Sequence, residues 1–302
     1  MGKSDWNENI KIIKEKITSI DLDAVSDPSL NYDLDEMEVI GDWIFSAAVP
    51  YDAPKQLKKN VLAALKAVGG NYQSIDYVLK RFGDIWVFPD PPEEKEIFYR
   101  ILRELKQEIE SIINSISSYK SVYLGERLAR NALVRLKASF RSSTLLISQG
   151  YFFEPTAICR LILEQIAWAY SIYEINDKEK ISNLKPTKAI SKLKKLVRYS
   201  GSLYGTLNIV THIDPEYDHD YSFETEDGII FINYTIPDKI FLVLYFLLIN
   251  ADIFRIASEY IFRYYDISLR SWEKNKKGEM ILVKDRPLNK EIKLVSKKLF
   301  KD

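Results

Sequence analysis

Apolar residues recur at helical spacing along most of the chain. Near the N-terminus, Ile10, Ile13, Ile17 and Ile20 alternate with lysines, which predicts an amphipathic helix over residues 6–20. The same pattern predicts helices over residues 35–48, 54–68 and 72–82. Together these segments form a predicted N-terminal helical region, residues 1–90, which ends at a cluster of prolines.

A second helical region is predicted over residues 91–265. Its first helix carries an apolar stripe with steps of three and four, backed by charged residues. Such a stripe either packs against helices of the same chain or forms a dimer seam, and its length of about three heptads favours packing within the chain. The stripe consists of Phe98, Ile101, Leu105, Ile109, Ile112 and Ile116.

Two long helices are predicted between residues 123 and 174, separated at Gly150. The second begins at Pro155 and is apolar in almost every direction, which is typical of a helix at the centre of a bundle. A basic helix over residues 186–199 and a short helix over residues 203–211 follow.

The most apolar stretch is IFLVLYFLLI, residues 240–249. A membrane-spanning helix needs about 20 apolar residues, so this stretch predicts a buried core helix and no membrane partner. The N-terminus carries no apolar signal region, and the single cysteine, Cys159, excludes an internal disulfide framework. We therefore expect a cytoplasmic protein.

Strand-like patterns are confined to short segments. Asp227-Gly228 lies between two β-prone runs and predicts a hairpin over residues 221–234. The C-terminal extension, residues 266–302, adds a small hairpin around Gly278 and a last amphipathic helix. With only 11 glycines and 11 prolines in 302 residues, the sequence predicts an all-α fold: a helical bundle with a small β-hairpin insertion and an N-terminal helical extension.

The formal net charge is zero because basic and acidic zones cancel. Residues 178–198 carry eight bases and one acid, whereas residues 214–227 carry seven acids and no base. Four bases of the helix over residues 126–149 also share a face about 80° wide. These faces either bind phosphates, are simply solvated, or dock the acidic loop of a second copy. The candidate nucleic-acid-binding residues are Arg127, Arg130, Lys137, Arg141, Lys188, Lys192 and Lys195.

Two charged residues interrupt the apolar helix that begins at Pro155. Arg160 and Glu164 are four residues apart and therefore share one face. Because an unpaired buried charge costs several kcal/mol, each must have a partner. They form either an internal ion pair that fixes helix packing or one wall of a pocket.

His212 ends the short helix over residues 203–211, and Asn208 lies one turn before it. Histidine suits proton transfer near neutral pH, and it equally suits the C-terminal cap of a helix. The sequence predicts no metal site and no cofactor: the acidic loop lacks the glycine and closing glutamate of a calcium loop, and His212 and His219 do not have zinc-ligand spacing. Cys159 is predicted to be a buried structural cysteine.

One arrangement resembles a known family. A helix that ends in LLISQGY is followed by a helix with Arg160-x-x-x-Glu164, and then by a short helix that ends in Asn208-Ile-Val-Thr-His212. Over about residues 124–264 this order is similar to the HEPN-like helical domains of bacteria and archaea. The resemblance implies a four- or five-helix bundle. Many members are metal-independent ribonucleases of toxin–antitoxin and antiphage systems, and others are non-catalytic.

The chain departs from the catalytic members, which carry an arginine a few residues before the histidine. Here the nearest upstream arginine is Arg198, so Arg160 on the neighbouring helix must supply the cation. In this hypothesis His212 is the general acid or base, Glu164 orients Arg160, and Asn208 holds the phosphate or the histidine.

The sequence thus leads to two hypotheses. In the first, the chain binds or cleaves RNA in a defence or stress-response system and, if it is an enzyme, is a metal-independent ribonuclease. In the second, it is a non-catalytic helical protein that forms a homodimer or holds a protein partner. A small-molecule pocket in the aromatic-rich bundle is a third option. The geometry of Arg160, Glu164 and His212 discriminates between them, since a site requires that they meet in one solvent-reachable cleft.

Overall fold

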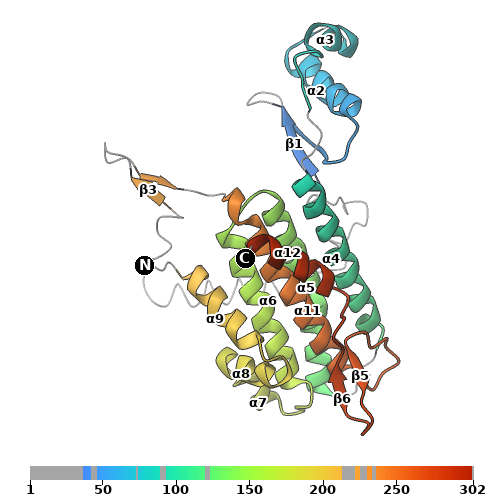
Figure 1. Cartoon of the computed structure of the whole chain (residues 1–302), viewed down its shortest axis with the longest axis vertical. Helices are drawn as coiled ribbons and strands as arrows, with labels where there is room; N and C mark the ends of the chain where they lie inside the picture. The colour runs from blue at the N-terminus through green and yellow to red at the C-terminus, as the bar shows by residue number, and fades with distance from the viewer. Residues whose placement is uncertain are drawn as a thin grey trace, which may run out of the picture.

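The computed structural model is mostly helical, and the strands of its described part form only two-stranded antiparallel hairpins (Figure 1). The predicted all-α class with a small β-hairpin insertion is therefore confirmed. The helix expected over residues 6–20 lies outside the described residues. The structure describes residues 37–41, 46–72, 74–88, 93–119, 123–212, 222–224, 230–232 and 236–300.

The N-terminal unit, residues 37–88, combines a β-hairpin with two helices. Strand β1 (Met37–Gly41) pairs with β2 (Ser46–Pro50), and α2 (Lys55–Gly69) and α3 (Ile75–Phe82) follow. The helix predicted over residues 35–48 is wrong. Gly41 has a φ of 116°, which ends the first strand and breaks a helix, and the β-branched residues before it favour extended backbone.

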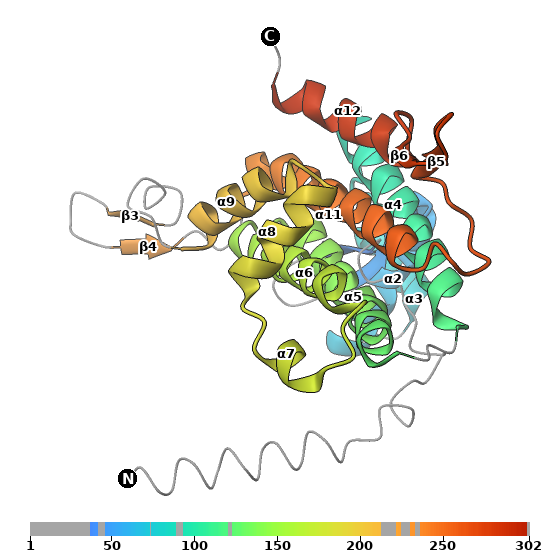
Figure 2. The ribbon, with the colours of Figure 1, turned by 90° about the horizontal axis from the view of Figure 1, so that it is seen from below.

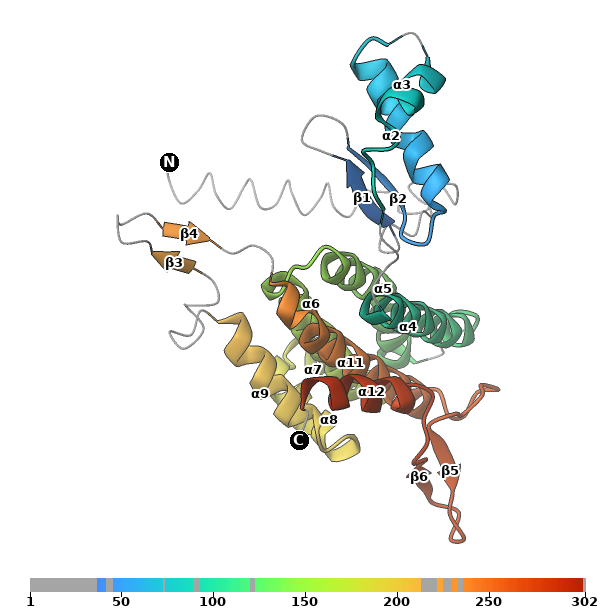
Figure 3. The same cartoon turned by 45° about the horizontal axis from the view of Figure 1, so that its top comes forward.

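This N-terminal unit lies beyond one end of α4 (Glu93–Ser117) (Figures 1 and 3). Its contacts with that helix include a hydrogen bond of 2.7 Å from Arg103 of α4 to the hydroxyl of Tyr51. Lys95 of α4 pairs with Glu38 of β1 at 2.5 Å, and the ring of Tyr51 stacks on the ring of Tyr99 with centroids 3.9 Å apart.

Four long helices make the bundle: α4, α5 (Leu124–Ser148), α6 (Phe153–Ile172) and α11 (Ile240–Ile261). Helices α5 and α6 are the two long helices predicted from the sequence, and Gly150 between them has a φ of 84°. Gly125 allows α5 to approach the end of α6, since a Cβ there would lie 2.0 Å from the carbonyl oxygen of Ile172. The pair is thus held close at both ends.

The apolar stripe of α4 is fully covered within the chain. Its six residues are between 0% and 7% exposed, and the helix packs on α5 and α11. The expectation of packing within the chain is confirmed, and the stripe is not available as a dimer seam.

Three short helices follow α6 in the chain, of which α8 and α9 pack on it, and two hairpins extend from the bundle. The short helices are α7 (Lys178–Ser182), α8 (Pro186–Leu196) and α9 (Ser200–Thr211). The hairpin of β3 (Ser222–Glu224) and β4 (Ile230–Ile232), predicted at this place, projects on the side of α9, and the hairpin of β5 (Trp272–Lys274) and β6 (Met280–Leu282) projects on the opposite side (Figures 2 and 3).

Helix α11 is a buried core helix, as predicted. It follows the 3₁₀ turn Pro237–Lys239 and continues past the apolar stretch to Ile261, so its 22 residues are long and apolar enough to cross a membrane by those two criteria alone. The prediction considered only the apolar run of residues 240–249, and the absence of a membrane partner stays a prediction. Most of the helix is buried against α4, α5, α6 and α12 (Asn289–Leu299).

Helix α11 also carries buried charges that the sequence reading did not consider. Arg255 pairs with Glu108 of α4 and, at 2.8 Å, with Glu259, which in turn accepts a hydrogen bond from the N–H of Ser271 at 2.7 Å. These contacts connect α4, α11 and the start of the C-terminal segment.

A second buried carboxylate of α11, Asp252, lies about two turns before Glu259. Asp252 accepts hydrogen bonds from Arg286 at 2.7 and 2.8 Å and from the hydroxyl of Tyr199 at 2.7 Å. This bidentate ion pair fixes the segment before α12 against the bundle. Burial and the neighbouring Asp252 carboxylate raise the pKa of Tyr199.

Candidate functional site

Arg160 and Glu164, the two charged residues within the apolar helix α6, lie next to the C-terminal end of α9. Nη1 of Arg160 lies 3.2 Å from Nε2 of His212 and 3.3 Å from Oγ1 of Thr211. Nε of the same side chain lies 3.2 Å from Oε1 of Glu164. The structure therefore brings together three of the four predicted catalytic residues, which we call the Arg160 cluster: Arg160, Glu164 and His212.

The local structure of α9 explains the position of His212. The residue occupies the C-cap of α9, where its backbone is extended and its N–H donates to the carbonyl of Asn208 at 3.1 Å. The hydroxyl of Thr211 donates to the carbonyl of Leu207 at 2.8 Å. His212 thus caps the helix with its backbone while its ring is presented to Arg160.

Tyr204, one turn into α9, completes the surroundings of Glu164. Its hydroxyl donates to Oε1 of Glu164 at 3.2 Å, and its ring centroid lies 5.6 Å from the guanidinium carbon of Arg160. The sequence reasoning missed Tyr204 and Thr211 as partners. They lie 40 and 51 residues away from the α6 groups that they contact, so no spacing within one helix could identify them.

Asn208 is half-buried on α9. Its carbonyl oxygen accepts from the N–H of His212, but its side chain makes no hydrogen bond to Arg160, Glu164 or His212, all of which are described. Its contact with the cluster is therefore through the backbone, and its expected role in holding phosphate stays a prediction.

The Arg160 cluster is open to solvent. The side chains of Arg160 and Glu164 are 26% and 24% exposed, and His212 is exposed. The ion pair is therefore not sealed in the core, and the three groups meet at a surface that a ligand can reach.

The hydrogen bond between Arg160 and His212 determines the tautomer of the ring. A guanidinium can only donate, so Nε2 of His212 must accept, and the ring proton must then be on Nδ1. In this state Nε2 of His212 has the lone pair that a general base needs. In the structure this lone pair accepts the hydrogen bond from Arg160.

A groove of about 470 Å³ between α5 and α6 adjoins the cluster, because Glu164 is one of its lining residues. Its walls are mostly apolar and include Trp168 and Leu161, which is 45% exposed. Arg135 of α5 and Gln165 of α6 add polar groups.

The basic residues of α8 are exposed, and within the described ranges no salt bridge to their side chains is seen. Lys188 and Lys195 are exposed, and Nζ of Lys192 donates to the carbonyl of Ser171 at 3.3 Å. Helix α8 leads directly into α9, whose far end carries the cluster. The acidic loop over residues 214–227, the alternative partner of this face, lies almost wholly outside the described residues.

The basic residues of α5 lie on a different surface. Lys137 and Arg141 line a groove toward α4, where Nζ of Lys137 lies 2.8 Å from Glu110, while Arg127 is exposed and Arg130 is half-buried nearer the start of the helix. An α-helix turns about 100° per residue, so these four bases of α5 face away from the α5 residues that line the groove beside Glu164. The seven predicted nucleic-acid-binding residues therefore form two separate faces.

Neither a metal centre nor a reactive thiol is seen in the described part of the chain. No group of three or more His, Cys, Asp or Glu side chains there is suited to hold a metal ion, and His219 lies outside it. Cys159 is fully buried, with Sγ 3.8 Å from Oγ of Ser143, and burial raises the pKa of its thiol to about 12. The prediction of a buried structural cysteine is confirmed.

When the chain is compared with protein-family models, with curated proteins and with solved structures, none matches. The geometry of the Arg160 cluster is therefore the main indication of function.

Proposed function

We propose that this chain binds RNA and cleaves it without a metal ion at the Arg160 cluster. The observation that carries the proposal is the 3.2 Å approach of Arg160 Nη1 to His212 Nε2 at a solvent-reachable surface. One cation and one acid–base group side by side are the minimum that phosphodiester cleavage by a neighbouring hydroxyl requires. A defence or stress-response setting is suggested only by the HEPN resemblance.

The reaction is a transfer within the RNA. Nε2 of His212 takes the proton of a ribose 2′-hydroxyl, the 2′-oxygen bonds to phosphorus, and the bond from phosphorus to the 5′-oxygen breaks. The leaving 5′-oxygen takes a proton from water. The products are a 2′,3′-cyclic phosphate and a 5′-hydroxyl, and Arg160 neutralises the charge that develops on the phosphorane oxygens.

Substrate binding also makes Nε2 of His212 available as the general base. Charge-assisted hydrogen bonds to phosphate are stronger than one to a neutral imidazole, so the incoming phosphate attracts Nη1 of Arg160 away from His212. Glu164 retains the guanidinium through Nε at 3.2 Å, and Nε2 of His212 becomes available to the 2′-hydroxyl. In this mechanism Glu164 is a positioning residue.

The surroundings of the cluster suit single-stranded RNA. The exposed lysines of α8 attract phosphates, and the 12 residues of α9, about 18 Å long, separate them from His212. The groove beside Glu164 offers the ring of Trp168 as a stacking surface for an unpaired base.

Alanine variants assayed on total RNA in the presence of EDTA test the proposal. We expect His212→Ala to lower the cleavage rate by at least about 100-fold, since general acid–base catalysis contributes that much. His219→Ala, which removes the only other histidine of the chain, is the matched control and should cleave normally. Undiminished cleavage by His212→Ala would remove the catalytic role of the cluster.

A further inference from the structure

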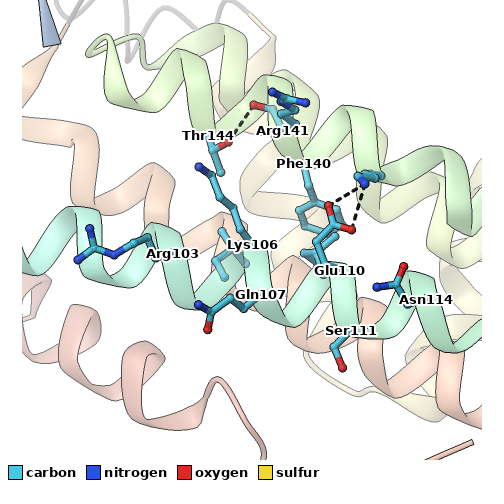
Figure 4. Close-up of a pocket in the computed structure, with 12 residues that line it drawn as sticks. Arg103, Lys106, Gln107, Glu110, Ser111, Asn114, Phe140, Arg141 and Thr144 are labelled. Atoms are coloured by element: carbon cyan, nitrogen blue, oxygen red, sulfur yellow. Dashed lines mark hydrogen bonds and ion pairs between the residues drawn. The ribbon is translucent and has the colours of Figure 1, made fainter. Parts of the chain in front are cut away.

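A second groove lies between α4 and α5, on the side of α5 away from Glu164 (Figure 4). Its volume of about 760 Å³ falls within the range of roughly 300–1,000 Å³ that is usual for small-ligand sites. It is larger than the groove of about 470 Å³ beside Glu164. The RNA mechanism above does not use it.

Positive charge dominates this groove. Arg103 and Lys106 from α4 and Lys137 and Arg141 from α5 are among its lining residues, together with one acid, Glu110, so the lining residues have a formal charge of +3 (four bases minus one acid). The guanidinium of Arg103 also donates to the hydroxyl of Tyr51 at 2.7 Å. Figure 4 shows the side chain of Lys106 extending from α4 toward α5. Cations from two helices that line one groove of this size favour a compact ligand with several negative charges.

The groove also has an apolar side. Leu105, Ile109 and Phe140 line it while being only 1%, 4% and 3% exposed, so each belongs to the core and reaches the groove with a small part of its surface. Gln107 and Asn114 of α4 are also among the lining residues and add amide groups. A ligand that fits both sides has a phosphate chain and a flat ring system with hydrogen-bonding edges.

We propose that the groove between α4 and α5 binds a nucleoside polyphosphate. The phosphates contact Lys106, Lys137 and Arg141, and the base lies toward the apolar side with its edge near the amides. The inference does not rest on RNA cleavage, because no residue of the Arg160 cluster lines this groove.

The ion pair of Lys137 and Glu110 gives the site a distinctive property. Its atoms are 2.8 Å apart, but the two side chains are 50% and 44% exposed, and exposed pairs of this kind are weak. A phosphate group therefore replaces Glu110 as the partner of Lys137. Removing the carboxylate charge should strengthen ligand binding rather than weaken it.

Calorimetric titration of the full chain with ATP at low ionic strength, without divalent metal, tests the proposal. We expect Lys106→Gln and Arg141→Gln each to weaken binding about tenfold, as is usual when a hydrogen bond to a charged group is lost. Glu110→Gln should tighten binding severalfold. Inorganic triphosphate should bind more weakly than ATP, because it has no base for the apolar side.

Arg130→Gln is the matched control. Arg130 shares the helix face of Lys137 two turns earlier, about 10 Å away, but does not line the groove, so ATP affinity should not change. An equal loss in Arg130→Gln and Arg141→Gln would show that the whole face of α5 binds an extended polyanion, which would overturn the proposal. So would a wild-type chain that does not bind ATP, or a Glu110→Gln chain that does not bind it more tightly. Thermal melting of each variant separates lost binding from lost folding, and Glu110→Gln remains informative if a cation variant fails to fold.

Discussion

Arg160 is surrounded by groups from two helices. Glu164 lies on the same helix, while Thr211, His212 and the ring of Tyr204 come from α9. A planar guanidinium can donate in several directions at once, which a lysine ammonium cannot do with the same geometry. The side chain is therefore oriented by the protein before any substrate arrives.

Glu164→Gln tests whether that orientation matters. The amide keeps the size of the side chain but removes the charge that holds Nε of Arg160, so we expect kcat for RNA cleavage to fall about tenfold with a smaller change in KM. The free energy of unfolding should change by less than about 1 kcal/mol, because the ion pair is about one quarter exposed.

Glu164→Asp should recover part of the activity, since it restores the charge. Glu154→Gln, an exposed position in the first turn of the same helix, is the control and should cleave normally. If Glu164→Gln retains the kcat of the wild type, Glu164 does not position Arg160 for the reaction.

The sequence predicted part of the site. The spacing of Arg160 and Glu164 showed that they share one helix face, and the need of buried charges for partners indicated that other groups must approach them. The identity of Tyr204 and Thr211 could not be predicted. Helical periodicity gives the face of one helix, but the residues opposite it depend on how α9 packs on α6.

At the scale of the elements, the long helices were predictable because their periodicity extends over many turns. Helices α5, α6 and α11 are of this kind. Strands β1 and β2 could not be predicted from periodicity, since a short apolar run does not distinguish a helix from a strand. Pairing of β1 with β2 decides the structure of residues 37–41 and 46–50.

The docking of α12 gives a prediction about pH. Glu291, in the first turn of α12, is 4% exposed, and burial together with a hydrogen bond shared with Glu104 raises the pKa of Glu291. A raised pKa in the folded state means that the carboxyl stabilises the fold fully below its unfolded pKa, about 4.3, and that this contribution is lost as the pH rises through the folded value.

We therefore expect Glu291→Gln to melt at a higher temperature than the wild type at pH 7, and the difference to shrink toward pH 4. Melting curves over this pH range measure it. Glu273→Gln, which changes an exposed carboxylate of β5, should show no such trend. A lower melting temperature of Glu291→Gln at pH 7 would contradict the assignment.

At the scale of the whole molecule, the apolar core is unevenly distributed. One large cluster includes buried residues of α4, α5, α6, α8, α9, α11 and α12, whereas the N-terminal unit has two small clusters, centred on Leu62 and Val78. Regions with few buried apolar contacts open at a lower free-energy cost than the main core.

Amide hydrogen exchange should reflect this difference. We expect the amides of α2 and α3 to exchange at least about tenfold faster than those of α5, α6 and α11, and mass spectrometry of peptides from the intact chain measures both. Equal protection of the two regions would mean that they unfold as a single unit.

The ends of the RNA products decide whether the Arg160 cluster performs the proposed chemistry. A 5′-labelled single-stranded RNA is incubated with the purified chain in EDTA, and the termini of the fragments are determined by mass spectrometry. We predict 2′,3′-cyclic phosphate ends, no cleavage where the 2′-hydroxyl is replaced by hydrogen, and loss of the products in His212→Ala. An RNA that stays intact, or cleavage that continues without the 2′-hydroxyl or without His212, would contradict the proposed mechanism.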